Sequence, residues 1–131
     1  METLVVDASV LVHVLQRSEE GRRATRQLRD RELVAPAHID AEVLHGLAGL
    51  ARGGHLDERR AAQARRRLVS LPMARFPIAP IVEAAWGLRH NLSLYDALYL
   101  ALARTIGCPL LTFDRGFATA PVRGGTITLL T

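Results

Sequence analysis

The feature that most constrains the fold is a short apolar run that leads into an aspartate, found once near the start of the chain and once near its end. Residues 4–8 read LVVDA, and residues 108–114 read CPLLTFD. Short apolar runs of this kind are typical of strands that are buried on both faces of a parallel sheet. Because helical patterns separate the predicted strands along the chain, the sequence predicts an α/β fold with a parallel sheet.

The remaining elements follow from apolar periodicity and from residues that begin or end helices and strands. We expect further strands at residues 33–36 and 75–80, and a last strand at residues 126–130 on the edge of the sheet. We expect helices at residues 9–17, where Ser9 is the expected cap, and at 19–32, 38–52, 56–71, 81–89 and 93–107. The last of these helices is apolar nearly all round, which places it in the core.

The chain shows no repeat, low-complexity tract or linker. Its 131 residues fit one domain of a common size, large enough to bury one core. We therefore expect residues 1–131 to form a single domain, built as a three-layer sandwich in which helices flank a central parallel sheet of four to five strands.

Composition excludes several classes of protein. All 17 basic residues are arginine, and the absence of lysine excludes P-loop enzymes, Schiff-base enzymes and phosphatases that need a lysine beside their aspartate. No apolar run approaches the roughly 18 residues that cross a bilayer. The first residues lack a basic flank, and Asp7 interrupts their apolar stretch, unlike a signal peptide. With Cys108 as the single cysteine, we expect a cytoplasmic protein without membrane association.

The arginines are concentrated in two predicted helices. The two clusters are Arg22, Arg23, Arg26, Arg29 and Arg31, and Arg59, Arg60, Arg65, Arg66 and Arg67. Arginine binds phosphate in a bidentate manner, so helices of this kind can hold RNA. Solvated helix faces explain the same pattern, and the sequence leaves both interpretations open.

Four of the 13 acidic residues interrupt apolar sequence: Asp7, Glu42, Asp96 and Asp114. Asp7 and Asp114 end predicted strands, and the other two lie in the first turns of helices, so all four can reach the carboxyl edge of a parallel sheet, where ligands bind. Two carboxylates about 5 Å apart repel by roughly 3 kcal/mol at an effective dielectric constant of about 20. Four such groups would either take up protons or bind a hard cation. Their oxygen-only donor set indicates Mg²⁺ or Mn²⁺ rather than zinc.

Each acid also has a structural explanation. Asp7 and Asp114 can cap the helices that follow them. Asp96 lies three residues after Ser93, so that SLYD reads as a capping box. Glu42 lies in a first turn, where the helix dipole favours an acid.

Two hydroxyl residues flank these acids at useful spacing. Ser9 follows Asp7 by two residues, and Thr112 precedes Asp114 by two. We expect either hydroxyl to position a metal-bound water or a phosphate oxygen. The alternatives are helix capping for Ser9 and a hydrogen bond at the end of the strand for Thr112.

Four segments of the chain resemble the signature segments of a known family, the PIN-domain ribonucleases. The segments are VVDASVLV with Asp7 and Ser9, APAHIDAEVLHGL with Glu42, LSLYDALYLALA with Asp96, and CPLLTFDRGF with Asp114. Their order and spacing are most similar to those of the VapC-type toxins of bacterial toxin–antitoxin pairs. The resemblance extends to about Phe117 and implies a PIN-like sandwich whose acids cluster at the carboxyl edge of its sheet.

The resemblance implies an endoribonuclease that depends on Mg²⁺ or Mn²⁺, in which the ion activates water for in-line attack on an RNA phosphodiester. It implies catalytic roles for four acids and metal ligation by three of them. The catalytic residues are Asp7, Glu42, Asp96 and Asp114; the metal ligands are Asp7, Asp96 and Asp114; and Ser9 and Thr112 occupy positions that are commonly polar.

The resemblance also implies partners. Relatives usually act as homodimers, and a cognate antitoxin protein silences them by inserting its C-terminal tail into the acidic groove. Gly116 and Phe117 supply no further acid after Asp114, whereas some relatives carry one, which argues against a second metal ion.

Two other functions compete with this interpretation. A metal-dependent phosphohydrolase of small molecules is disfavoured, because Asp7 begins a DxS rather than a DxD pattern and lysine is absent. A catalytically silent module on the same fold would bind RNA or a partner through its arginine helices, and the four intact acids weigh against it.

Overall fold

The strands of the computed structural model, which describes residues 1–119 and 127–131, form one parallel sheet. In these residues the five strands are β1 Thr3–Val6, β2 Glu32–Pro36, β3 Met73–Phe76, β4 Leu110–Thr112 and β5 Ile127–Leu129. They lie in the order β3-β2-β1-β4-β5, and every neighbouring pair is parallel. The predicted parallel sheet is confirmed, and so is the expected edge position of the last strand.

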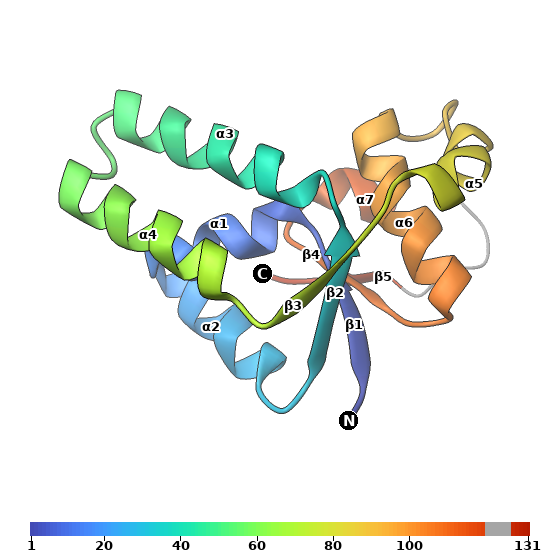
Figure 1. Ribbon diagram of the computed structural model, residues 1–131, viewed down its shortest axis with the longest axis horizontal. Helices are drawn as coiled ribbons and strands as arrows, with labels where there is room; N and C mark the ends of the chain where they lie inside the picture. The colour runs from blue at the N-terminus through green and yellow to red at the C-terminus, as the bar shows by residue number, and fades with distance from the viewer. Residues whose placement is uncertain (120–126) are drawn as a thin grey trace.

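Helices cover both faces of this sheet, which makes the fold a three-layer α/β sandwich as predicted (Figure 1). The helices of the described residues are α1 Ala8–Gln16, α2 Glu19–Leu28, α3 Ile39–Arg52, α4 Glu58–Ser70, α5 Val82–Trp86, α6 Leu94–Ile106 and α7 Arg115–Thr119, with a 3₁₀ turn at Ala79–Ile81. In Figure 1, α1 to α4 lie to the left of the strands, and α5 and α6 lie to the right. Within the described residues, no helix combines the length and apolarity that crossing a bilayer requires.

The core lies between the sheet and its two helical layers. The apolar residues of β1 and β4 are buried, including Val5, Val6 and Leu110 with no exposed surface. Helix α6 packs against β1, β2 and β4, and it buries residues on most of its circumference, among them Tyr99 and Leu100. This confirms the predicted core position of that helix.

The strand order creates a switch point between β1 and β4. From β1 the chain adds β2 and then β3 on one side, and it later returns to add β4 and β5 on the other side. In sheets of this kind ligands bind beyond the carboxyl ends of the strands at the switch point. Asp7 follows β1 directly and Asp114 comes two residues after β4, so the topology brings both to this position.

Some predicted boundaries were wrong. Helix α2 ends at Leu28 rather than at residue 32, because Asp30 turns the chain with a left-handed φ of 60° before β2. Strand β3 covers residues 73–76 rather than 75–80, because Pro77 and Pro80 have no N–H to donate to a neighbouring strand. Helix α7 was not expected, and position 126 of the last predicted strand lies outside the described residues.

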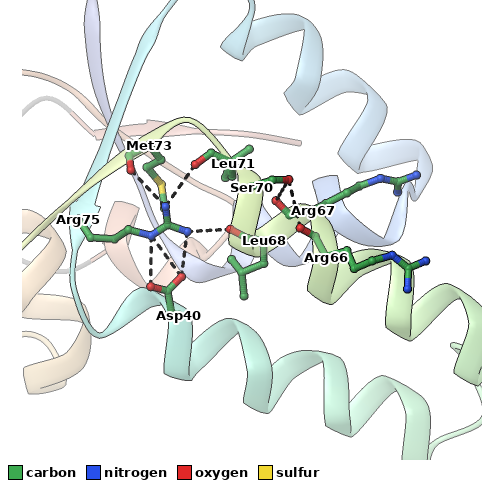
Figure 2. Close-up of polar contacts among 8 residues, drawn as sticks. All are labelled: Asp40, Arg66, Arg67, Leu68, Ser70, Leu71, Met73 and Arg75. Atoms are coloured by element: carbon green, nitrogen blue, oxygen red, sulfur yellow. Dashed lines mark hydrogen bonds and ion pairs between the residues drawn. The ribbon is translucent and has the colours of Figure 1, made fainter.

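The shifted strand β3 also carries a tie between two helices. The guanidinium group of Arg75 donates to both carboxylate oxygens of Asp40 in α3, with distances between 3.1 and 3.4 Å (Figure 2). It also donates to the carbonyl oxygen of Leu68 at 2.8 Å and to that of Leu71 at 3.3 Å, at the end of α4. The last carbonyls of a helix have no partner within the helix, so Arg75 supplies one.

Candidate active site

Asp7 is the most enclosed of the four predicted acids, with only 4% of its surface exposed. It is the N-cap of α1, where one carboxylate oxygen, Oδ1, accepts a hydrogen bond from the backbone N–H of Val10 at 3.2 Å. The same oxygen accepts from Ser9 Oγ at 2.6 Å, and Oδ2 accepts from Thr112 Oγ1 at 2.5 Å. The expectation that Ser9 caps this helix was therefore wrong, because Asp7 itself is the cap.

The two hydroxyls connect Asp7 to the segment that follows β4. Ser9 Oγ accepts a hydrogen bond from the backbone N–H of Phe113 at 3.1 Å, and Thr112 Oγ1 accepts from that of Asp114 at 2.9 Å. Each hydroxyl donates its single proton to Asp7, so both hold this carboxylate in place across the switch point. Their expected role toward a metal-bound water or a phosphate oxygen stays a prediction.

Burial governs the ionisation of Asp7. It raises the pKa of the carboxyl group from its ordinary value of 3.8 to about 6, although the hydrogen bonds from Ser9, Thr112 and Val10 oppose the shift. The negative charge of Asp96 adds to the increase, which means that Asp96 lies within electrostatic reach of Asp7.

Asp96 lies in the first turn of α6 and is half-buried. Its backbone N–H donates to Ser93 Oγ at 3.1 Å, so the predicted N-cap interaction of Ser93 is present. Burial raises the pKa of Asp96, and the negative charges of Asp114 and then Glu42 raise it further. Asp96 therefore couples electrostatically to each of the other three predicted acids.

Asp114 is the most exposed of the four acids. Its Oδ1 atom accepts a hydrogen bond from the backbone N–H of Gly116 at 2.8 Å, which holds the carboxylate at the start of α7. A side chain added at Gly116 would place its Cβ 3.0 Å from that same oxygen. The close approach of Gly116 explains the small residue at this position.

Glu42 lies in the first turn of α3 and has partners that the sequence interpretation did not include. Its Oε1 atom accepts a hydrogen bond from the Tyr99 hydroxyl at 2.7 Å and lies 3.1 Å from Nε2 of His38. Burial acts to raise the pKa of Glu42, but the hydrogen bonds from His38 and Tyr99 outweigh it and lower the pKa. Glu42 is thus held in its ionised form.

The His38 side chain is largely enclosed, with 12% of the side chain exposed. Its ring lies 4.7 Å from that of Tyr99 and stacks on that of Tyr95 at 5.7 Å. Nε2 faces two acceptors, Glu42 and the carbonyl oxygen of Tyr95 at 3.1 Å, so it carries the ring proton. The signals available in the sequence were the four-residue spacing of His38 and Glu42 and the three-residue spacing of Asp96 and Tyr99.

Asp96 thus lies within electrostatic reach of the other three acids. Their charge and their oxygen donors suit a hard divalent cation. Within residues 1–119 and 127–131, however, no group of three or more His, Cys, Asp or Glu side chains is arranged to hold one metal ion. Binding a single ion through three of these acids would therefore require their side chains to move closer together.

Comparison with known proteins gives matches over most of the chain. A family model described as PIN domain matches residues 4–122. Ribonuclease VapC3 of Mycobacterium tuberculosis is 40% identical over 120 residues, which cover 91% of this chain and 88% of that protein. Ribonuclease VapC1 of the same organism is 38% identical over 123 residues, which cover 92% of each chain.

Solved structures share the fold at low sequence identity. The crystal structure of VapC20 of Mycobacterium tuberculosis, described as a Sarcin-Ricin loop cleaving toxin, matches with a TM-score of 0.66 and 23% identity, over 88% of this chain and 92% of that one. VapBC2 from Rickettsia felis, bound to a DNA fragment from its promoter, matches with a TM-score of 0.68 and 11% identity, over 98% of this chain and 99% of that one.

Proposed function

The chain belongs to the PIN-domain family, and from that premise we propose that it is a metal-dependent endoribonuclease, the toxin of a toxin–antitoxin pair. Two curated relatives at 38–40% identity are named ribonucleases. The observation that carries the proposal is the burial of Asp7 at the switch point, with a pKa of about 6 in the field of Asp96. We further propose that residues 1–131 form a single ribonuclease domain.

The proposed roles follow from the contacts of each acid. Asp7, Asp96 and Asp114 are the proposed ligands of a Mg²⁺ or Mn²⁺ ion. When bound, the ion supplies positive charge for the phosphoryl oxygens and lowers the pKa of a water molecule. Ser9 and Thr112 keep the Asp7 carboxylate in one orientation at the end of β1.

Glu42 is the proposed fourth catalytic acid. Tyr99 and His38 both bond its Oε1 atom and hold it ionised, and Oε2 makes no hydrogen bond within the described residues. That second oxygen is therefore available to accept a proton from, or a hydrogen bond donated by, a water molecule that attacks RNA.

The proposed partners are cellular RNA, a cognate antitoxin and a second copy of the chain. VapBC structures from Rickettsia felis and Salmonella typhimurium, both bound to DNA, share the fold, and this likeness supports an antitoxin that binds and silences the acidic site. Because RNA is the proposed substrate, we propose that the protein acts in the cytoplasm.

Cleavage of RNA by the purified protein, freed of any partner, tests the proposed function. We expect cleavage with Mg²⁺ or Mn²⁺, none in EDTA, and a loss of at least about 100-fold in Asp7→Asn, because ligation needs the charged carboxylate. Asp30→Asn is a matched control, since Asp30 is exposed and its left-handed φ of 60° suits asparagine.

Cleavage that persists in EDTA, or full activity in Asp7→Asn, would show that the acids do not act through a metal. RNA binding without any cleavage under these conditions would instead favour the catalytically silent binding module.

A further inference from the structure

Five arginines from three parts of the chain surround one cavity, on the side of the molecule where α1, α2 and α4 lie. The cavity has a volume of about 620 Å³ and lies between the end of α1, one face of α2 and the C-terminal end of α4. The arginines that line it are Arg17, Arg22, Arg26, Arg29 and Arg67. None of the four predicted catalytic acids lines it.

Local structure explains why these side chains converge. Arg22 and Arg26 are four residues apart, so they share one face of α2, and Arg29 is the C-cap residue that follows this helix. Arg17 ends α1 with a left-handed φ of 59°, where the chain turns toward α2. Arg67 comes from the last turn of α4 on the opposite wall, and Figure 2 shows its side chain extending away from the Arg75 tie. The two arginine clusters of the sequence therefore supply the same cavity.

This cavity carries positive charge without a counter-charge. No carboxylate lines it. In the part of the chain that the structure describes, none of its five guanidinium groups makes an ion pair or a hydrogen bond, whereas the neighbouring Arg23 pairs with Glu19 at 3.5 Å and Arg65 with Glu58 at 3.3 Å. Like charges gathered around a concave surface repel one another and attract anions. On a helix face that is only solvated, we would expect arginines to pair with nearby acids, as Arg23 and Arg65 do. The arginines at the cavity lack such pairs.

The chemistry of the walls and floor suits a nucleic acid backbone. Guanidinium groups bind phosphate oxygens in a bidentate manner, and arginines from two walls can contact successive phosphates. The cavity is also lined by apolar surface from Val14, Leu15, Leu71 and Pro72, against which a ribose or a base face can pack. We propose that this cavity is a second RNA-binding site, which holds the backbone of the strand that the acidic site cleaves.

The distance between the acidic site and the arginine cavity indicates which part of the RNA the cavity can contact. Asp7 and Arg17 lie at opposite ends of α1, and ten residues of helix extend about 15 Å. The cavity therefore does not contact the phosphate that is cleaved, and it binds the same strand several nucleotides away. The proposal rests on the proposed function, because that function identifies the substrate as RNA. Since the cavity binds the strand away from the cleaved phosphate, we expect it to affect KM rather than kcat.

Binding of a labelled single-stranded RNA in EDTA, measured over a range of salt concentrations, tests the proposal without cleavage. The test variant is Arg22→Gln/Arg26→Gln. Its matched control is Arg59→Gln/Arg66→Gln, which removes the same charge from two exposed positions of α4 that do not line the cavity. Because each lost phosphate contact lowers the log–log salt slope by about 0.7, we expect the test variant to lose about 1.4 and to bind about tenfold more weakly at physiological salt.

The opposite wall gives an independent measurement. We expect Arg67→Gln alone to lower the salt slope by about 0.7, because it would contact the same strand. With a metal ion present, the test variant should raise KM for a long RNA about tenfold and leave kcat unchanged. Circular dichroism and a thermal melt establish that each variant is folded.

The outcomes separate this proposal from the proposed function. An equal loss of affinity in the test and control variants would show a diffuse charge effect and overturn the second site. Unchanged RNA affinity in the test variant would also overturn it, and weaker binding of an acidic protein partner by that variant would then identify a protein as the occupant. If the salt slopes differ as expected but no RNA is cleaved with metal, the cavity is upheld and the nuclease function fails.

Discussion

Among single residues, Asp7 and Glu42 acquire opposite proton affinities from similar carboxyl groups. Both are buried to some extent, which disfavours the charged form. For Asp7 burial outweighs three hydrogen bonds, and its pKa rises to about 6. For Glu42 the bonds from His38 and Tyr99 outweigh burial, and its pKa falls. Near pH 6 Glu42 is therefore ionised while Asp7 is about half protonated, so protons compete with a metal ion at Asp7.

The raised pKa of Asp7 predicts a specific dependence of stability on pH. Between about pH 4 and pH 6, Asp7 is protonated in the folded protein but ionised in the unfolded chain, so stability falls as the pH rises through this window. The shift from 3.8 to about 6 corresponds to roughly 3 kcal/mol, which is fully present as a cost above pH 6. We expect this component of the free energy of unfolding to be absent in Asp7→Asn.

Urea unfolding of both proteins in EDTA at pH 4 and pH 7 measures this effect. Other acids titrate in both proteins, so the difference between wild type and variant isolates Asp7. If that difference is the same at both pH values, Asp7 is not buried with a raised pKa.

Among the elements, Arg75 of β3 connects this strand to α3 and α4, and these contacts favour the observed position of β3. With β3 at Met73–Phe76, Arg75 lies opposite Asp40 and the end of α4 (Figure 2). Periodicity cannot reveal this, because the partners of Arg75 are up to 35 residues away along the chain. Strand β3 was accordingly predicted two residues late, while helices with long apolar stripes were located well.

We expect Arg75→Ala to lower the free energy of unfolding by about 2 kcal/mol, because it leaves Asp40 and the last carbonyls of α4 without their charged donor. Asp40→Asn should cost less, since the contacts of Arg75 with Leu68 and Leu71 remain. Arg66→Ala is the matched control: its side chain points away from the tie in Figure 2, and we expect a change within about 0.5 kcal/mol. Chemical denaturation measures all three, and equal effects of Arg75→Ala and Arg66→Ala would refute the structural role of the tie.

At the scale of the whole molecule, several of the large apolar side chains that are exposed belong to one stretch of the chain. Between the end of β3 and the first turn of α6 the exposed residues are Phe76, Val82, Trp86, Leu94 and Tyr95. Helix α5 packs on α6, so this apolar region borders the acidic site at Asp96. Exposed apolar clusters of this kind mark protein interfaces, and we propose that this one joins two copies of the chain.

We expect Trp86→Glu to convert a dimer into a monomer at micromolar concentration, because a tryptophan that is buried in an interface commonly contributes at least about 2 kcal/mol to binding. Trp86 is 52% exposed, so the substitution leaves the core intact. Val69→Glu replaces an apolar residue that is 83% exposed on α4, and it should leave the oligomeric state unchanged. Light scattering after gel filtration gives the mass of each, and a Trp86→Glu dimer would place the interface elsewhere.

The residue pattern alone was enough to predict the α/β class, the buried strands β1 and β4 and the core helix α6, and it singled out four acids whose catalytic roles stay predictions. These features depend on local pattern, because apolar runs interrupted by acids can be recognised without any knowledge of distant contacts. Helix α7 and the end of α2 could not be predicted, because short or polar segments show little apolar periodicity.

The surroundings of Asp7, Glu42 and the arginines became evident only from the three-dimensional fold. Long-range packing brought Thr112 to Asp7 over 105 positions and Tyr99 to Glu42 over 57, and it set Arg67 against the arginines of α2. The physical reason is that burial and hydrogen bonding depend on neighbours in space, which chain spacing predicts only within one helix or strand. The strand that ends in Asp7 was therefore evident from its residues, while the raised pKa of that aspartate followed from the fold.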